Sequence, residues 1–264
     1  MDFIATSDLH GVLPKDMMPF DLLMICGDIL PDYRGNGYRV QKQKLWMKHE
    51  FIPWVENLPY KEAWSKVIVV PGNHDFLFES MTDAEKLEYE YLTGYRMKIL
   101  NHAMYEFEFP VADGTDSLKI FGTPYCSIFG TWPFMVNNDA LERYFSQIPE
   151  DTDILLSHDA PSIYGLGDIT EGPWKREGGG NAILAKHIYR VKPLIFHCGH
   201  IHSGNHKFEC RDGIWCANVS QMNEDYLPQN WFLQYQFDEE SRTVNYSGYD
   251  EEEPSKRKNT IMAM

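Results

Sequence analysis

The chain has 264 residues, with 24 Lys and Arg against 39 Asp and Glu, so its net charge is −15 when histidine is neutral. Hydrophobic residues make up 43% and aromatic residues 14%, enough to bury a sizeable core, and this excludes a disordered protein. The acidity disfavours a duplex-binding surface, which needs clustered Lys and Arg, but it permits phosphate chemistry in which metal ions supply the positive charge.

The chain shows no targeting or membrane signal. It contains no run of about 18 apolar residues, and its start carries no basic segment followed by a long apolar one. Its five cysteines form no Cys-x-x-Cys pair, and their odd number favours reduced thiols over a disulfide framework. We therefore expect a cytoplasmic protein with no membrane partner, and the sequence leaves its oligomeric state open.

Short apolar runs bounded by Gly, Pro or Asp recur along the chain and predict buried strands. They cover residues 3–5, 22–26, 67–70, 118–121, 154–156 and 194–197. Helical patterns lie between several of them, at residues 39–57, 83–92 and 182–189. Pro53 is expected to kink or end the first helix, Thr82 or Asp83 to cap the second, and Asn181 to cap the third. Strands that alternate with helices predict an α/β fold with helices outside the sheet.

The last third of the chain changes character. Residues 207–209, 214–218, 231–237 and 243–246 have the pattern of hairpin strands, with Asp212-Gly213 as a turn. The stretch 238–253 holds seven acidic residues and one Arg, so it contributes −6 to the net charge. We predict one domain over residues 1–248 and a charged, flexible tail over residues 249–264.

Polar side chains follow five of the predicted strands, at the point where each strand ends. The five segments are Asp8-Leu9-His10, Gly27-Asp28, Gly72-Asn73-His74-Asp75, Ser157-His158-Asp159 and Gly199-His200-Ile201-His202. Because ligands of open α/β sheets gather outside the carboxyl ends of the strands, these segments should converge on one crevice. They offer carboxylate, amide and imidazole groups and no thiolate. This set suits a pair of Mn, Fe, Zn or Ni ions better than a structural zinc site.

The spacing within these segments has a physical use. In Asp8-x-His10 and in His200-x-His202, alternation places both side chains on the same side of the strand exit. A glycine directly before three of the polar residues permits a tight turn and a close approach to a metal. One carboxylate can bridge two cations through its two oxygens, and Asp28 is the best candidate for this role.

Taken together and in this order, the five segments resemble the motifs of the calcineurin-like metallophosphoesterase family. The resemblance spans about residues 3–205, and no ligand position is missing. It implies a four-layer α-β-β-α sandwich with a dinuclear metal centre at one edge. The short gap from Asp8 to Asp28 and the segment before His202 are similar to the MPPED-like phosphodiesterase branch of that family.

The resemblance also implies a role for each polar side chain. One cation would be held by Asp8, His10, Asp28 and His202, and the other by Asp28, Asn73, His158 and His200, with Asp28 bridging. Two such cations clamp phosphate oxygens and lower the pKa of a bridging water, and the resulting hydroxide attacks phosphorus in line. His74 is the implied general acid for the leaving alkoxide, and Asp75 would orient His74.

Two further segments are candidates to shape a substrate pocket, because they follow sheet edges near the motifs. Residues 125–137 include Trp132, and residues 160–180 include Trp174 and Arg176. The aromatic rings could stack on a base and the guanidinium could bind phosphate; packed loop aromatics and a solvated cation are the alternative. The remaining histidines are expected to be surface or packing residues, namely His49, His102, His187, His197 and His206.

These features predict a metal-dependent phosphoesterase that hydrolyses phosphodiesters or monoesters of small molecules, and the branch resemblance favours diesters. Two alternatives stay open. A metal-dependent nuclease could use the same centre, although the acidic chain has no basic stripe for a long polyanion. A non-catalytic scaffold could keep the fold without the chemistry, but such a protein could dispense with a ligand or the general acid, and neither is missing here.

Overall fold

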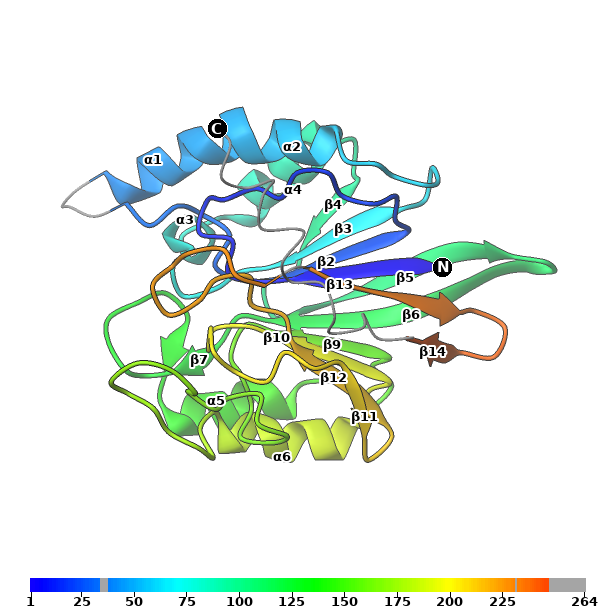
Figure 1. Cartoon of the computed structure of the whole chain (residues 1–264). Helices are drawn as coiled ribbons and strands as arrows, with labels where there is room; N and C mark the ends of the chain where they lie inside the picture. Colours follow the sequence, from blue (N-terminus) through cyan, green and yellow to red (C-terminus); the bar gives the residue numbers. More distant parts are fainter. Residues whose placement is uncertain (34–37, 231, 247–264) are drawn as a thin grey trace.

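Two six-stranded sheets lie face to face between two layers of helices (Figure 1). The computed structural model describes residues 1–33, 38–230 and 232–246. The strand order is β14-β13-β1-β2-β3-β4 in the first sheet and β11-β12-β10-β9-β6-β5 in the second. This arrangement is the four-layer α-β-β-α sandwich that the sequence predicts.

The first sheet is built around parallel strands, which are β1 (Asp2–Thr6), β2 (Leu22–Cys26), β3 (Lys66–Val70) and β4 (Met97–Ile99). Beside β1 the sheet continues with two antiparallel strands, β13 (Leu233–Asp238) and β14 (Thr243–Asn245). Because the parallel strands run the same way, their carboxyl ends share one edge of the sheet.

The second sheet repeats this plan. Its parallel strands are β6 (Gly114–Thr123), β9 (Ile154–Ser157), β10 (Ile195–Cys198) and β12 (Ile214–Asn218). At its two edges β5 (Ala103–Val111) pairs with β6, and β11 (Glu209–Arg211) pairs with β12, both antiparallel. A separate short pair, β7 (Cys126–Ser127) and β8 (Met135–Val136), lies beyond the end of β6.

A long helical segment covers the first sheet, made of α1 (Arg39–Trp46), the π-helical turn η1 (Met47–Phe51) and α2 (Ile52–Glu56). Pro53 does not end the helical segment, because it stands in the first turn of α2. Proline has no N–H, and in an α-helix its ring meets the carbonyl four residues earlier. The π turn directly before α2 loosens the backbone at this point, since the N–H of Ile52 bonds the carbonyl of Met47 five residues back.

Three of the other helices, α4, α5 and α6, begin at side-chain caps. On the side of the first sheet lie α3 (Phe76–Glu79) and α4 (Asp83–Leu92), and Thr82 caps α4 with a reciprocal bond from Glu85. Outside the second sheet lie α5 (Asn138–Ser146), capped by Asn137, and α6 (Ala182–Val191), capped by Asn181 as predicted (Figure 1).

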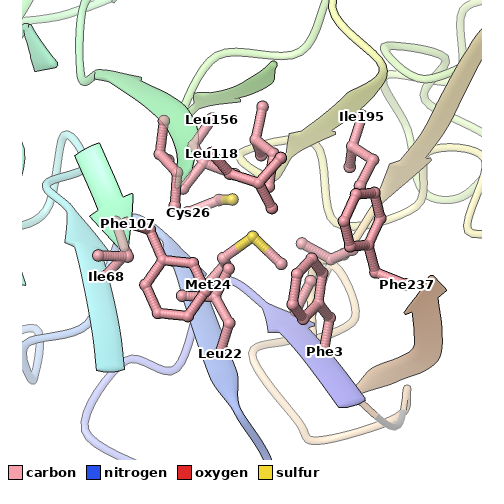
Figure 2. Close-up of a cluster of buried hydrophobic side chains, with 14 of the residues drawn as sticks. Phe3, Leu22, Met24, Cys26, Ile68, Phe107, Leu118, Leu156, Ile195 and Phe237 are labelled. Carbon is pink, nitrogen blue, oxygen red and sulfur yellow. The ribbon is translucent and has the colours of Figure 1, made fainter. Parts of the chain in front are cut away.

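Alternating side chains along the strands divide the interior into three apolar layers. In β2, Leu22, Met24 and Cys26 face the other sheet, whereas Leu23 and Ile25 face the helices. Figure 2 shows the middle layer, in which residues of the first sheet meet residues of the second. The third layer lies between the second sheet and helices α5 and α6. Both faces of each central strand are therefore buried, which explains the continuous apolar runs in the sequence.

Several expectations need correction. Strands β4 and β5 and helix α5 were not predicted, and the strand expected at residues 207–209 lies at Glu209–Arg211. Residue 231 and the predicted tail from 249 onward lie outside the described residues.

All five cysteines are free. Within the described part of the chain, no helix is both long enough and apolar enough to cross a membrane.

Candidate metal centre

The five polar segments meet at the edge where the parallel strands of both sheets end, on the left in Figure 1. Three of them follow β1, β2 and β3 of the first sheet, and two follow β9 and β10 of the second. Their side chains form two groups. Within each group, the possible ligand atoms lie within 4.8 Å of one another. The groups are Asp8, His10 and His202, and Asp28, His158 and His200.

In the first group, Asp8 is held by the segment that carries the histidine ligands. Its Oδ2 accepts the backbone N–H of His200 at 3.0 Å, and its Oδ1 lies 3.5 Å from Nε2 of His202. The other ring nitrogen of His202, Nδ1, lies 2.8 Å from the carbonyl oxygen of Asn223. A proton on Nδ1 satisfies that carbonyl and leaves the Nε2 lone pair for a cation.

The second group shows the same arrangement. Nδ1 of His158 lies 2.9 Å from the carbonyl oxygen of Cys26, so Nε2 points into the centre. This Nε2 atom is 2.8 Å from Oδ1 of Asn73 and 3.4 Å from Oδ2 of Asp28. The amide oxygen of Asn73 therefore lies next to the second group, and its role as a ligand stays a prediction.

Asp28 lies between the two groups. Its Oδ2 is 3.4 Å from Nε2 of His158 in the second group and 3.9 Å from Nε2 of His10 in the first. Its Oδ1 accepts the backbone N–H of His74 at 2.7 Å. The carboxylate therefore occupies the position that a bridging ligand requires.

Two independent features of the centre fit a bound cation. Both ring nitrogens of His10 are buried without a hydrogen-bond partner among the described residues, which is unfavourable unless another group binds there, and an imidazole nitrogen can bind a cation. The backbone is also strained, with φ of 56° at Asp8, 43° at His10, 51° at Asp28 and 68° at His200. Non-glycine residues with such backbone angles cluster at functional sites.

The glycines that precede ligands are required by close packing between segments. A Cβ atom on Gly27 would lie 2.2 Å from Nδ1 of His158, and one on Gly72 would lie 2.2 Å from Oδ1 of Asp28. A Cβ atom on Gly199 would lie 2.4 Å from Oδ2 of Asp8. Each glycine therefore makes room for a ligand from a neighbouring segment.

The charges in the centre shift the pKa values of its members. Burial alone would lower the pKa of His158, but the Asp28 carboxylate outweighs it and raises the pKa to about 10. At His202, burial again lowers the pKa and the Asp8 carboxylate raises it, and the net result is a pKa of about 9. Burial lowers the pKa of His10 to about 4. Burial would raise the pKa of Asp28, yet His158 and His74 hold it well below its usual range.

His74 lies beside the carboxylate of Asp28. Its Nε2 is 4.0 Å from Oδ2 of Asp28, and its Nδ1 is 3.7 Å from Oδ2 of Asp32. The side-chain amide of Gln43 donates to the carbonyl oxygen of His74 at 2.9 Å. The ring of Trp132 stacks on that of His74, with 4.3 Å between centroids. The predicted general acid and one predicted substrate contact are thus neighbours.

Asp75 does not have the expected role beside the His74 ring. Its Oδ1 accepts the N–H of Leu30 at 2.8 Å and of Ile29 at 3.0 Å, and its Oδ2 accepts the N–H of Gly72 at 2.8 Å. Its oxygens therefore connect the turn after β2 to the turn after β3. Burial and the charge of Asp28 raise the pKa of Asp75 to about 7. A second carboxylate besides Asp28, that of Asp32, lies near Nδ1 of the His74 ring, and no sequence motif marks it.

This ligand geometry agrees with the comparisons to known proteins. A family model described as calcineurin-like phosphoesterase matches residues 1–204. The chain belongs to the calcineurin-like phosphoesterase family. Members of this family bind divalent metals, and the two groups of candidate ligands are present in this member.

The named relatives support the same family. The chain is 29% identical over 244 residues to the human protein named metallophosphoesterase domain-containing protein 1, which covers 86% of this chain and 68% of that protein. It is 32% identical over 214 residues to a UPF0046 protein of Caenorhabditis elegans, which covers 76% of this chain and 68% of that one. The solved structure of TT1561 from Thermus thermophilus has the same fold, with a TM-score of 0.52 at 14% identity over 82% of this chain and 88% of that chain.

Two residues predicted to contact substrate lie apart from the candidate ligand groups. Trp174 is 79% exposed, and Arg176 is exposed with its backbone paired to that of Ile169. Among the described residues, neither forms a hydrogen bond, ion pair or ring contact with a candidate ligand. Their role in substrate binding stays a prediction.

Two aromatic residues that were not predicted as site residues border the candidate metal centre. The ring of Tyr226 lies 4.8 Å from that of His10, and the ring of Phe129 lies 5.3 Å from that of His200. Phe129 falls in the predicted pocket segment 125–137, but Tyr226 belongs to a loop between β12 and β13 that carries no motif. A single tyrosine in a polar loop gives no signal that could have identified it.

Proposed function

We propose that this phosphoesterase uses two divalent cations to hydrolyse phosphodiesters or monoesters of small molecules. The observation that carries the proposal is the position of Asp28, whose carboxylate is 3.4 Å from His158 of one ligand group and 3.9 Å from His10 of the other. A pair of cations sharing one carboxylate is the arrangement that activates water and stabilises charge on a phosphoryl group.

The residues of the chain supply the remaining functions. When bound, the two cations would polarise the phosphoryl oxygens and lower the pKa of water. His74 would give a proton to the alkoxide that leaves, because its Nε2 lies at the edge of the centre, 4.0 Å from Asp28. Asp32, 3.7 Å from Nδ1 of His74, would stabilise the protonated ring before that transfer.

The charge of the chain favours small substrates. With a net charge of −15, the protein repels long polyanions over most of its surface, whereas bound cations make the centre locally positive. A small phosphate ester is therefore the proposed partner, and duplex nucleic acid is not. The preference for diesters over monoesters, taken from the MPPED-like branch, is part of this proposal.

A screen of phosphate esters tests the proposal directly. The full chain, supplied with Mn, Fe, Zn or Ni, would be assayed on bis(p-nitrophenyl) phosphate, p-nitrophenyl phosphate, cyclic nucleotides and single-stranded oligonucleotides. Metal-dependent hydrolysis of the small esters is the expected result. Hydrolysis of oligonucleotides alone would favour the nuclease alternative.

Elemental analysis of the same samples separates the enzyme from the scaffold. We expect two transition-metal ions per chain after loading. Fewer than about one ion per chain under metal-replete conditions, together with no hydrolysis, would favour a non-catalytic scaffold, since a lone structural cation needs no bridging carboxylate.

A further inference from the structure

The loop between β12 and β13, drawn in orange in Figure 1, carries Tyr226, whose ring packs on the candidate metal centre. The ring centroid of Tyr226 lies 4.8 Å from that of His10, 5.1 Å from that of His202 and 6.1 Å from that of His74. Tyr226 therefore lies beside two candidate ligands and the candidate general acid. It is also 46% exposed, so its ring lies between solvent and the centre, where a substrate would enter.

The loop is fastened to the segment that carries His202. The carbonyl oxygen of Asn223 faces Nδ1 of His202 at 2.8 Å, and Glu224 accepts a hydrogen bond from the hydroxyl of Ser203 at 2.7 Å. Within the loop, Oδ1 of Asn223 accepts the N–H of Leu227 at 3.0 Å. These contacts hold the tip of the loop, and therefore Tyr226, beside the candidate ligands.

The backbone of Tyr226 does not explain why a tyrosine stands there. Its φ is +59°, a conformation that bulky side chains rarely adopt and that glycine adopts without strain. The contacts that place the loop come from Asn223 and Glu224 rather than from the phenol. The same φ occurs at Tyr95, away from the centre, so the strain alone does not mark a site; what distinguishes Tyr226 is that its ring lies beside two candidate ligands.

We propose that Tyr226 is a specificity-determining residue, whose ring packs on the alcohol portion of a phosphoester beside His74 and favours alcohols that carry a flat aromatic ring. The inference rests on the proposed function, which places the leaving alcohol next to His74. Trp132 adds a second aromatic surface at the same histidine, stacked at 4.3 Å. A substrate ring near His74 would meet edges and faces of aromatic side chains, the geometry that stabilises aromatic pairs.

Binding of two phosphonates tests this contact without requiring turnover. Phenylphosphonate and methylphosphonate both carry the phosphoryl oxygens, and only the first carries a ring. On the Mn-loaded protein, titration calorimetry should show phenylphosphonate binding about 3- to 10-fold more tightly, the range of one aromatic contact. In Tyr226→Ala this preference should disappear, while affinity for methylphosphonate stays the same. Equal affinities in the unsubstituted protein would overturn the proposal.

Further variants separate the ring from other effects. Tyr226→Phe should keep the preference, and a loss there would contradict a contact made by the ring. Tyr226→Gly relieves the strained backbone, so it should lose the preference while remaining as stable as the unsubstituted protein. Loss of Mn from Tyr226→Ala would show that the ring supports the ligands instead, which would also overturn the proposal.

Tyr95 provides a matched control. Its φ is also +59° and it is 45% exposed, but it precedes β4, at the opposite edge from the metal centre. Tyr95→Ala should leave both affinities unchanged, and an equal loss in that variant would contradict the proposal. A protein that prefers phenylphosphonate but hydrolyses no ester would contradict the proposed function while supporting the contact at Tyr226.

Discussion

Oδ2 of Asp28 lies 3.4 Å from Nε2 of His158, although Asp28 follows a strand of the first sheet and His158 follows a strand of the second. Both side chains are almost completely buried. The contact therefore crosses the sandwich at its edge, and a cation held there would be shared by both sheets.

Removing either side of this contact should abolish the reaction. Asp28→Ala and His158→Ala are expected to reduce Mn-dependent hydrolysis of bis(p-nitrophenyl) phosphate by more than about 100-fold, because even the loss of an outer partner of a metal ligand costs 10- to 100-fold. Metal content, measured by elemental analysis, should fall as well. The exposed Asp151 offers a control, and Asp151→Ala should retain full activity. Full activity in either centre variant would refute the ligand assignment.

Substitution of His74 should separate metal binding from turnover. His74→Ala is expected to keep both metal ions and lose about 100- to 10,000-fold in kcat, the usual contribution of a general acid. The loss should be greater for esters with poor leaving groups, because p-nitrophenolate departs without a proton more readily than an alkoxide. Steady-state rates with a series of phenyl esters check this. Loss of metal from His74→Ala would mean that His74 is a ligand or a structural residue.

A methyl group on Gly27 should disrupt the centre through a neighbouring segment. In Gly27→Ala the new Cβ would lie 2.2 Å from Nδ1 of His158, so we expect loss of metal and a fall in unfolding free energy of more than about 2 kcal/mol, from overpacking added to backbone strain. Gly213 also has a positive φ, but a Cβ there meets nothing within 4 Å. Gly213→Ala should lose only about 1 kcal/mol and keep the metal. Equal effects in urea unfolding would contradict steric disruption at Gly27.

Metal binding should release protons. In the metal-free protein the pKa of His158 is raised to about 10 and that of His202 to about 9, chiefly by the carboxylates that oppose the effect of burial. Both rings are therefore protonated at neutral pH, and a cation must displace their Nε2 protons. Metal binding should strengthen as the pH rises from 7 to 9, and at pH 7 it should release about two protons. Calorimetry of Mn binding in two buffers with different ionisation enthalpies measures that number; no release would contradict ligation by these rings.

A buried histidine of β10 should contribute to the acid sensitivity of the fold. His197 is completely buried, with Nε2 2.9 Å from the hydroxyl oxygen of Tyr235, and burial lowers its pKa to about 3. The ring stays neutral in the folded state, whereas in the unfolded state it takes up a proton below pH 6.5. Protonation therefore favours unfolding, and stability falls as the pH drops from 6.5 toward 3. Between pH 6.5 and 5 the loss should be about 2 kcal/mol.

Urea unfolding in the presence of a chelator measures this loss without a contribution from bound metal. His197→Gln should have a shallower pH dependence than the unsubstituted protein, since glutamine does not titrate. The exposed His49 serves as a control, because His49→Gln should leave the pH dependence unchanged. Identical profiles for all three proteins would assign the acid sensitivity to other groups.

The sequence identifies much of the centre because its residues follow buried strands. The apolar runs before Asp8, Asp28 and Asn73 mark strand ends, and parallel strands bring their ends to one edge. The order of the strands in the sheets, which sequence spacing alone does not reveal, brings these side chains together with His158 and His200.

The role of Asp75 could not be predicted in the same way. Its position next to His74 in the sequence suggested a contact between their side chains. In the structure its carboxylate faces backbone N–H groups of the turn after β2, because the short turn leading into α3 points the two side chains apart. Asp32 and Tyr226 were missed because their proximity to the centre depends on loop paths, which hydrophobic periodicity does not encode.

Strand β5 and helix α5 were missed for a different reason. Along β5, Phe107 and Phe109 are buried whereas Glu106 and Glu108 are exposed, so the strand has a polar face and lacks the continuous apolar run of the central strands. Helix α5 has the usual signals, with Asn137 as its cap and Leu141 and Phe145 on its buried face. It directly follows residues 125–137, which we predicted to form a substrate loop, and its pattern was read as part of that loop.

Each candidate metal site draws ligands from both sheets: Asp8 and His10 face His202 in one, and Asp28 faces His158 and His200 in the other. Elsewhere the sheets are joined mainly by apolar packing, which has no preferred direction, with a few polar contacts such as the one between His197 and Tyr235. Cations at this edge would add directional cross-links, so the first backbone amides to exchange with solvent after chelation should be those at the ends of β1, β2, β9 and β10. Changing the metal would alter how firmly the two halves of the molecule are joined, as well as the rate of any reaction between them.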